Sequence, residues 1–409
     1  MTGRPADRYA TRGELVLVLN CGSSSIKFAL FDRGRDPLPR TPAWNGKVQG
    51  IGGPSPTYGE TGIEPAPLAL DAEHPYRCAL QRIREGVLAR LDGRALAAVA
   101  HRVVHGGSKY FEPTRIDAGV LADLEGYIPL APLHQPFALE AIAILLRERP
   151  DLPQVACFDT GFHHTLPDVE KLLPLPFEVW RRGVRRYGFH GLSYEYLATA
   201  LPERFGELAR GRVVVAHLGS GASLCAMQDL RSVATTMGFS ALDGLMMGTR
   251  TGSLDPGALL YLMEIEQLSL EEVARMLYHR SGLLGVSGLS PEPRVVVRHE
   301  GDPGEAGERA RLALALYVRR IVREVGALAA VLGGLDLLVF TAGVGEQNAF
   351  VRERVCRDLA FLGVALDEAA NAADAPVISS ADSRVAVGVE PTNEEWVAAR
   401  DALRVCRAE

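Results

Sequence analysis

The chain has 409 residues, 47% of them hydrophobic, and a formal net charge of −6 at pH 7. This length exceeds what one hydrophobic core usually supports, so we expect two globular domains. The acidic balance, without any long run of basic residues, excludes nonspecific nucleic-acid binding, and no apolar stretch is long enough to span a membrane.

The six cysteines lie far apart, and no two of them form a Cys-x-x-Cys pair. That spacing favours reduced thiols over a disulfide framework or a zinc site. Residues 1–13 are polar and charged without an apolar core, which indicates a flexible tail rather than a signal peptide or a membrane anchor. We therefore expect a cytoplasmic protein with no membrane partner.

The first regular element is a predicted β-hairpin with a polar tip. Residues 15–31 place two apolar runs of strand length on either side of a stretch of small polar residues. Gly22 lets backbone N–H groups approach phosphate oxygens, the hydroxyl groups of Ser23 and Ser25 add donors, and Lys27 supplies a positive charge. Taken alone, the stretch is explained equally well as an ordinary hairpin with polar decoration.

A similar pattern recurs half a chain later, at residues 212–229. Its Gly219 and Ser220 repeat the Gly-Ser pair of the first turn, and His217 takes the place of Asn20. Two phosphate-type hairpins in one chain predict duplicated domains that face one nucleotide.

The patterns between the two hairpins predict alternating helices and strands. In chain order they are a strand at 44–49, a helix at 79–91, strands at 96–104 and 155–158 on either side of a helix at 138–147, and a helix capped by Ser193 that ends near 201. Asp159 directly follows a buried strand, where it is suited to chemistry or to capping the next element. His101 and His105 are less suited to bind a metal, because an i, i+4 pair on a strand is well separated.

After the second hairpin, a glycine-punctuated loop at 244–257 carries Arg250, whose guanidinium group is suited to hold an anion. The further elements are a helix through 264, a long helix at 305–332, a strand at 335–340, a glycine-rich turn at 341–348, a helix at 349–359, a strand at 385–389 and a terminal helix capped by Thr392 or Asn393. The apolar stripe of 305–332 suits the core and a subunit contact. Glu394 and Glu395 are either helix-dipole partners or site residues.

Neither a P-loop nor a Gly-x-Gly-x-x-Gly dinucleotide motif occurs, so the hairpins belong to another class of nucleotide-binding protein. Segments that follow one another from about residue 14 to the C-terminal end closely resemble the acetate kinase family. They are residues 20–27, 101–107, 133–134, 158–160, 187–191, 217–223, 247–250, 341–346 and 391–395. Such ordered agreement is more specific than any single motif.

The resemblance implies a fold and a reaction. The fold is α/β, with two duplicated actin-like (ribonuclease H-like) domains around a nucleotide cleft. Residues 14–162, completed by the C-terminal helix at 394–409, form one domain, and residues 163–393 form the other. The implied reaction is a direct in-line phosphoryl transfer between ATP and acetate that gives acetyl phosphate and ADP, with Mg²⁺ or Mn²⁺. The resemblance also implies a homodimer.

The resemblance further implies roles for individual residues. The implied catalytic residues are Arg102, Asp159, His190 and Arg250. Those expected around the carboxylate substrate are Arg102, Val104, Leu133, His134, Phe189 and Ala241. Those expected at the nucleotide, the first hairpin included, are Ser23, Ser25, Lys27, His217, Leu218, Gly219, Ser220, Gly221, Glu292, Pro293, Arg294, Gly343, Val344, Gly345, Glu346 and Gln347, and those expected at the metal are Asn20 and Glu394. Because acetate is already ionised at neutral pH, we expect Asp159 to orient the site rather than act as a base.

Some positions depart from the family pattern. Gln135, Ser220 and Gln347 replace Asn but keep a side chain that forms hydrogen bonds. Residues 291–294 read Pro-Glu-Pro-Arg where Ser-Asp-x-Arg is usual, which leaves adenine and guanine nucleotides both open. Ala241 replaces a Pro and predicts a roomier acyl pocket. A propionate- or butyrate-type carboxylate kinase is therefore an alternative, and an actin-like ATPase switch is a more distant one.

Overall fold

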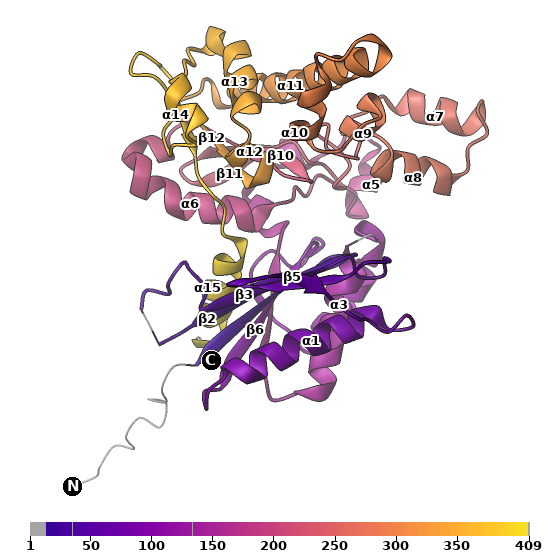
Figure 1. Cartoon of the computed structure of the whole chain (residues 1–409), viewed down its shortest axis with the longest axis vertical. Helices are drawn as coiled ribbons and strands as arrows, with labels where there is room; N and C mark the ends of the chain where they lie inside the picture. Colours follow the sequence, from indigo (N-terminus) through magenta and orange to yellow (C-terminus); the bar gives the residue numbers. More distant parts are fainter. Residues whose placement is uncertain (1–13, 35, 133, 408–409) are drawn as a thin grey trace. The chain divides into compact units, whose positions relative to one another are not determined.

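The computed structural model describes residues 14–34, 36–132 and 134–407. These residues form two compact units. The chain up to Gly161 and from Asn393 onward makes up the first, and Phe162–Thr392 makes up the second. Each unit contains one mixed sheet with helices packed against it (Figure 1), so the predicted α/β class is confirmed. The tail predicted at residues 1–13 and Leu133 of the predicted substrate site lie outside the described residues.

The first unit is built on an eight-stranded sheet. In spatial order its strands are β5 (Ile63–Pro67), β4 (Thr57–Glu60), β3 (Trp44–Gln49), β2 (Ser25–Asp32), β1 (Leu15–Cys21), β6 (Leu96–Val103), β8 (Gln154–Phe158) and β7 (Thr114–Arg115). Strand β1 pairs antiparallel with β2 and parallel with β6, and β6 is parallel to β8. Almost all of β1 is buried, because helices cover both faces of the sheet.

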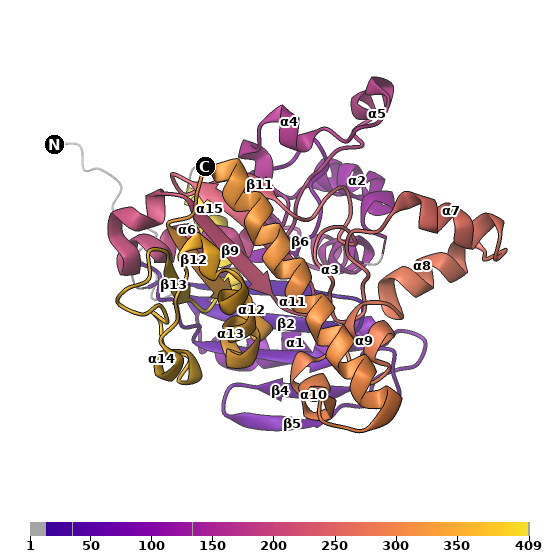
Figure 2. The ribbon, with the colours of Figure 1, turned by 90° about the horizontal axis from the view of Figure 1, so that it is seen from above.

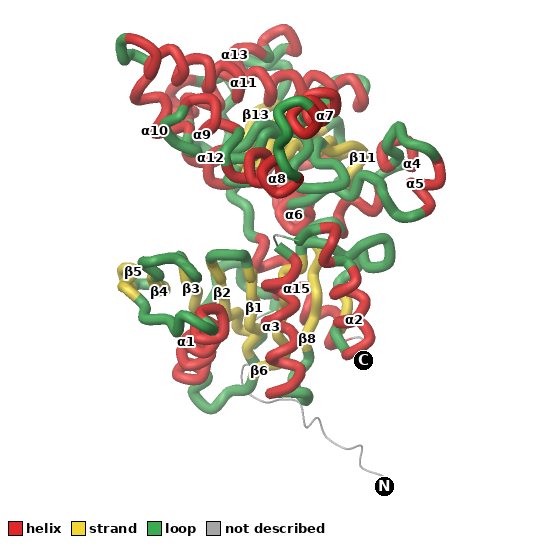
Figure 3. The backbone as a smooth tube through the Cα atoms, turned by 90° about the vertical axis from the view of Figure 1, so that its right-hand side faces the viewer, coloured by secondary structure: helices red, strands yellow, loops and turns green. Residues whose placement is uncertain are grey.

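The helices of the first unit are α1 (Pro75–Arg90), α2 (Ala118–Gly126), α3 (Gln135–Glu148) and α15 (Glu394–Arg407). Helices α1 and α3 lie on one face of the sheet and α15 on the other (Figures 1 and 3). Leu15, Leu17 and Leu19 alternate along β1 and join the hydrophobic core under α1 and α3. Asn393 Oδ1 accepts a hydrogen bond from the Trp396 N–H at 3.1 Å, so the predicted cap of α15 is confirmed.

The second unit is built on a five-stranded sheet. Its strands, in spatial order, are β11 (Arg231–Thr235), β10 (Ala222–Gln228), β9 (Val213–Leu218), β12 (Leu337–Thr341) and β13 (Ala386–Val389). Strand β9 pairs antiparallel with β10 and parallel with β12. The arrangement of β1, β2 and β6 therefore recurs here, and the second predicted hairpin is confirmed.

The helices of the second unit are α4 (Asp168–Lys171), α5 (Phe177–Arg181), α6 (Gly191–Phe205), α7 (Pro256–Glu264), α8 (Leu270–His279), α9 (Gly282–Ser287), α10 (Pro293–Val296), α11 (Gly304–Leu332), α12 (Ala342–Gln347), α13 (Ala349–Asp358) and α14 (Glu368–Ala372). Helix α11 crosses the sheet against β9, β10 and β11 (Figure 2). Its Tyr317 and Ile321 are buried, whereas Leu312 and Val331 are exposed.

The predicted homodimer stays a prediction. None of the helices in the described ranges is long and apolar enough to cross a membrane.

Two local predictions are wrong. Ser193 does not cap α6, because the helix begins at Gly191 and Ser193 is buried within its first turn. Residues 342–347 form the short helix α12 rather than a turn. Ala342, with a left-handed φ of 64°, ends strand β12 abruptly, and tertiary contacts then hold the glycine-rich residues in helical form.

One tertiary contact of α12 is the guanidinium group of Arg352, which is fully buried. Its Nη1 donates to the carbonyl oxygens of Gly345 and Glu346, both at 2.9 Å. Its Nε donates to Asn371 Oδ1 at 2.8 Å, and its Nη2 donates to the Asn371 carbonyl at 2.8 Å and to Asp374. All five N–H donors of the side chain are therefore used to hold α12 against α13 and α14.

We expect Arg352→Met to lower the free energy of unfolding by about 3 kcal/mol, because it leaves buried carbonyl groups without donors. Urea unfolding followed by circular dichroism measures this change. Arg357→Met is the matched control on the same helix, where the side chain is 65% exposed, and is expected to shift stability by less than about 0.5 kcal/mol. Equal effects of the two substitutions would show that Arg352 does not anchor α12.

Candidate active site

The tip of the first hairpin is a tight turn in which the Gly22 N–H donates to the Ser25 carbonyl at 2.8 Å. Asn20 of β1 lies directly opposite Lys27 of β2. Ser23 and Lys27 are exposed, and Ser25 is half-buried. The polar groups predicted to meet phosphate are thus accessible at one end of the strands.

Arg102 and Asp159 form a bidentate ion pair where the parallel strands β6 and β8 end. Arg102 Nε donates to Asp159 Oδ1 at 2.9 Å, and Nη2 donates to Oδ2. Arg102 Nη1 donates to Asn20 Oδ1 at 3.1 Å, and a Glu394 carboxylate oxygen lies 3.7 Å from Arg102 Nε. Asn20, Arg102, Asp159 and Glu394 therefore form one cluster in the first unit, in which two N–H groups of the arginine are left to meet a ligand.

Burial and neighbouring charges shift the pKa values of Arg102 and Asp159 in opposite directions. Asp159 is 2% exposed, and burial raises the pKa of its carboxyl group, against the opposing effect of the Arg102 guanidinium. Burial acts to lower the pKa of Arg102, but the carboxylates of Asp159 and Glu394 raise it above its ordinary value. Arg102 consequently stays charged, with its orientation set by Asp159.

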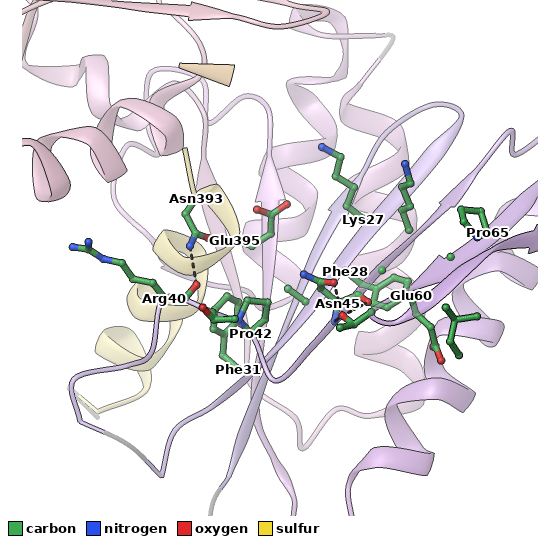
Figure 4. Close-up of a pocket in the computed structure, with 17 residues that line it drawn as sticks. Lys27, Phe28, Phe31, Arg40, Pro42, Asn45, Glu60, Pro65, Asn393 and Glu395 are labelled. Atoms are coloured by element: carbon green, nitrogen blue, oxygen red, sulfur yellow. Dashed lines mark hydrogen bonds between the residues drawn. The ribbon is translucent and has the colours of Figure 1, made fainter. Parts of the chain in front are cut away.

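A cavity of about 630 Å³ opens on the sheet of the first unit, between β2, β3 and the start of α15 (Figure 4). Lys27 and Lys47 stand directly opposite each other on β2 and β3 at its wall. Glu395 projects into it from α15. Burial raises the pKa of the Glu395 carboxyl group, as does neighbouring Glu394, while Lys27 opposes the rise. Two like charges directly opposite each other repel, and an anion bound between the ammonium groups would relieve this repulsion. This wall of the cavity is therefore suited to an anion.

In the second unit, the rings of His190 and His217 stack with centroids 4.1 Å apart and an angle of 14° between their planes. His217 is the penultimate residue of β9 and lies directly opposite Ser223 of β10. His190 precedes α6 in the left-handed conformation, with a φ of 61° that is uncommon for a residue with a side chain. His190 Nδ1 is 2.8 Å from Ser223 Oγ, and His217 Nδ1 is 2.9 Å from Ser193 Oγ.

The sequence analysis missed Ser223, Tyr194 and the role of Ser193. The Tyr194 hydroxyl lies 2.5 Å from Ser223 Oγ, so Ser223 connects it to His190. Two signals were available in the sequence. Tyr194 follows His190 by one helical turn, and Ser223 faces His217 once the hairpin register is known.

Arg250 and His190 both lie near Gly221 of the second hairpin turn. Arg250 Nη1 donates to the Ala241 carbonyl at 3.3 Å, and burial lowers the pKa of its guanidinium group. A Cβ on Gly221 would stand 3.1 Å from His190 Nε2 and 3.5 Å from Arg250 Nη1. The missing side chain of Gly221 therefore leaves a small space that an imidazole and a guanidinium group both border.

Most of the other predicted nucleotide residues lie in or next to short helices of the second unit. Gly343 is the second residue of α12, and a Cβ added there would meet nothing within 4 Å. Glu346 Oε1 accepts hydrogen bonds from the N–H groups of Ala342 at 2.7 Å and Thr392 at 3.2 Å, so this carboxylate holds the protein's own backbone. The remaining members of this group are Leu218 and Ser220 at the second hairpin, Glu292, Pro293 and Arg294 at the start of α10, and Val344, Gly345 and Gln347 in α12.

Some residues predicted for the acyl pocket belong to the first unit and others to the second. Val104 and His134 are half-buried in the first, and Phe189 (3% exposed) and half-buried Ala241 belong to the second. His163 Nε2 donates to the Phe189 carbonyl at 3.0 Å and so fixes the peptide that leads into His190. Ala241 is tied to Arg250 through its carbonyl oxygen.

An α/β fold with a glycine turn, imidazole and guanidinium groups in one unit and a paired arginine in the other suits an ATP-dependent phosphotransferase. The similarity to known proteins assigns the chain to that class. The chain belongs to the acetokinase family, whose model matches residues 15–400.

Curated relatives cover almost the whole chain. An acetate kinase of Rhodopseudomonas palustris is 47% identical over 398 residues, which is 96% of this chain and 98% of the relative. An acetate kinase of Rhizobium meliloti is 46% identical over 97% of this chain and 99% of its own length.

Solved structures of the same family superpose well. The acetate kinase of Porphyromonas gingivalis has a TM-score of 0.83 and 37% identity, over 96% of this chain and 99% of its own. A propionate kinase of Francisella tularensis has a TM-score of 0.87 and 33% identity, over 95% of this chain and 98% of its own.

We expect Arg102→Lys to lower kcat by roughly 100-fold, because an ammonium group keeps the charge but cannot form the two parallel bonds to Asp159. Arg94→Lys is the matched control, since Arg94 pairs with Asp32 at 3.2 Å on a partly exposed surface of the same unit. Initial rates and urea unfolding are measured for both. A kcat within twofold of the wild type in Arg102→Lys would remove the bidentate pair from the mechanism.

Proposed function

We propose that this chain transfers the γ-phosphoryl group of ATP directly to a short-chain carboxylate, with acetate as its main substrate. A carboxylate oxygen forms the new P–O bond while the bond from phosphorus to the ADP oxygen breaks, so the products are an acyl phosphate and ADP. The observation that carries this proposal is the 47% identity, over 96% of the chain, to a protein named acetate kinase.

The geometry of the two clusters supports roles for their residues in this transfer. Arg250 and His190 border the small space at Gly221, where they suit the equatorial oxygens of a transferring phosphoryl group, over which its negative charge is spread. Arg102 suits the carboxylate substrate. Asp159 is fully engaged with Arg102, which supports an orienting role, and an ionised carboxylate substrate needs no base.

Asn20 and Glu394 are the residues that we propose for Mg²⁺ or Mn²⁺. Their side chains offer oxygen atoms, the ligands that these ions prefer, and both lie at Arg102. Among the described residues no group of three or more His, Cys, Asp or Glu is arranged to hold a metal. A nucleotide-bound Mg²⁺ takes only one or two ligands from protein, and when bound it would neutralise charge on the phosphates.

Propionate is the second carboxylate that the chain suits. The similarity to a propionate kinase at a TM-score of 0.87 favours it, and so does Ala241, which is smaller than the proline that the family usually has. Because the Ala241 carbonyl accepts from Arg250, this loop also affects the position of a catalytic guanidinium group.

The reaction is tested by following ATP consumption with and without acetate, and by trapping the product with hydroxylamine, which converts an acyl phosphate to a hydroxamate. We expect consumption to depend on added carboxylate and hydroxamate to form in equal amount to ADP. ATP turnover at the same rate without carboxylate would instead assign the chain to the ATPase switches of this fold.

We expect Ala241→Pro to lower kcat/KM for propionate relative to acetate by several-fold, because the added ring carbons occupy the space of one methylene, which is worth about 1 to 3 kcal/mol in an apolar pocket. Rates with acetate, propionate and butyrate give the ratios. Ala241→Ser, which changes polarity but hardly volume, is the matched control. An unchanged ratio in Ala241→Pro would mean that Ala241 does not set chain length.

A further inference from the structure

We infer that the hydroxyl groups of Ser223 and Ser193 hold His190 and His217 as the neutral tautomer protonated on Nε2, so that both rings direct an N–H donor at the turn formed by Gly219 and Gly221. Tyr194 is a positioning residue in this arrangement, because it determines which way the Ser223 hydroxyl donates. The tautomers follow from contacts within the second unit alone. Their effect on phosphoryl transfer rests on the proposed function.

The direction of the hydrogen bond between Tyr194 and Ser223 follows from the burial of both residues. Tyr194 is fully buried, and within the described part of the chain Ser223 Oγ, at 2.5 Å, is the hydrogen-bond partner of its oxygen. If Ser223 donated to Tyr194 instead, the phenolic O–H would be left buried without an acceptor, which is costly. Tyr194 therefore donates and Ser223 accepts.

The Ser223 hydroxyl hydrogen is then directed at His190. Ser223 is also fully buried, and in the described residues its hydroxyl contacts Tyr194 Oη and His190 Nδ1, the latter at 2.8 Å. Since Ser223 accepts from Tyr194, its own hydrogen is satisfied only by donating to Nδ1. Nδ1 must then carry the lone pair, and the ring proton of neutral His190 must be on Nε2.

The same reasoning applies to His217. Ser193 is fully buried, and the polar contact that the described residues give its hydroxyl is His217 Nδ1, at 2.9 Å. A donating serine again leaves the ring proton on Nε2. Because the two rings stack at 4.1 Å, protonating both of them would place two positive charges face to face, which favours neutral rings.

Both Nε2 atoms lie at the glycine turn. A Cβ on Gly221 would stand 3.1 Å from His190 Nε2, and a Cβ on Gly219 would stand 3.7 Å from His217 Nε2. Phosphate oxygens only accept hydrogen bonds, so an N–H at these positions attracts them, whereas the opposite tautomer would present a lone pair. The serines thus decide whether the stacked rings attract or repel the anion.

The tautomers are read directly by long-range ¹H–¹⁵N correlation NMR of the full-length protein labelled with [¹⁵N]histidine, at neutral pH and without nucleotide. The chain has ten histidines, and His190→Gln and His217→Gln assign the two signals by their loss. We expect a lone-pair-type Nδ1 and a protonated Nε2 in both rings. Protonated Nδ1 in His190, alone or together with Nε2, would overturn the inference.

His163 provides an internal reference of known tautomer. Its Nε2 is 3.0 Å from the Phe189 carbonyl, which can only accept, so Nε2 carries the proton and Nδ1 accepts from Ser232 Oγ at 2.8 Å. Ser232→Ala is therefore the matched control for loss of a serine–imidazole bond. It is expected to shift the His163 signals and to leave those of His190 unchanged.

Ser223→Ala is expected to shift His190 toward a mixture of tautomers and to lower kcat by about tenfold. The KM for the carboxylate is expected to stay within about twofold of the wild-type value. Tyr194→Phe keeps the serine donor, so it should preserve the tautomer and have a smaller effect. Ser223→Thr, which keeps the hydroxyl, should restore kcat. If the wild-type rings have the expected tautomers but Ser223→Ala keeps full kcat, the positioning role of Ser223 is wrong.

The proposed reaction and the proposed tautomers are tested independently of each other. If the wild-type protein consumes ATP without a carboxylate, the proposed reaction is wrong, while the NMR result still decides the tautomers. If Ser223→Ala does not fold, the wild-type spectrum decides the same question, because a protonated Nδ1 of His190 contradicts donation from Ser223.

Discussion

The pairing of strands in the two hairpins determines where the polar side chains of each unit lie. In the first, the register places Asn20 opposite Lys27, and in the second it places His217 opposite Ser223. A slip of one residue would turn each of these side chains to the other face of its sheet. The register is held by the apolar positions of the same strands, such as Leu17 in the core under α1 and α3. The chemistry of each turn therefore depends on packing several residues away.

The fully buried Arg352 and the half-buried Arg102 differ in how they use their N–H groups. Arg352 uses all five within the protein, to carbonyl, amide and carboxylate oxygens, so it is suited only to hold structure. Arg102 uses three, two with Asp159 and one with Asn20. A partly engaged arginine has a fixed direction and still has donors for an anion. Counting donors thus separates a structural arginine from one that is suited to a substrate.

Much of the fold followed from local patterns in the sequence. Apolar runs of strand length on either side of small polar residues predicted both hairpins, and the position of Asp159 after a buried strand predicted a polar site at a strand end. The failures occurred where distant residues decide the local structure. Residues 342–347 are rich in glycine and suggest a turn, but Arg352 and Glu346 hold them as a helix. Sequence spacing cannot reveal such contacts before the chain is folded.

The same limit explains why Ser193 was assigned to the wrong role. A serine near the start of a helix is usually a cap, and only the stacked pair of histidines shows why this one is buried instead.

Charge and direction are supplied by different residues at the second glycine turn. The guanidinium charge of Arg250 acts over several ångströms whatever the exact contact, whereas a neutral imidazole attracts an anion only through the nitrogen that carries the proton. An arginine therefore needs little more than a position, but a histidine needs a partner that selects its tautomer. For His190 that partner is Ser223, which is itself constrained by Tyr194. Removing the Ser223 hydroxyl would leave the ring of His190 in place but no longer select the tautomer that makes it useful to a phosphoryl group.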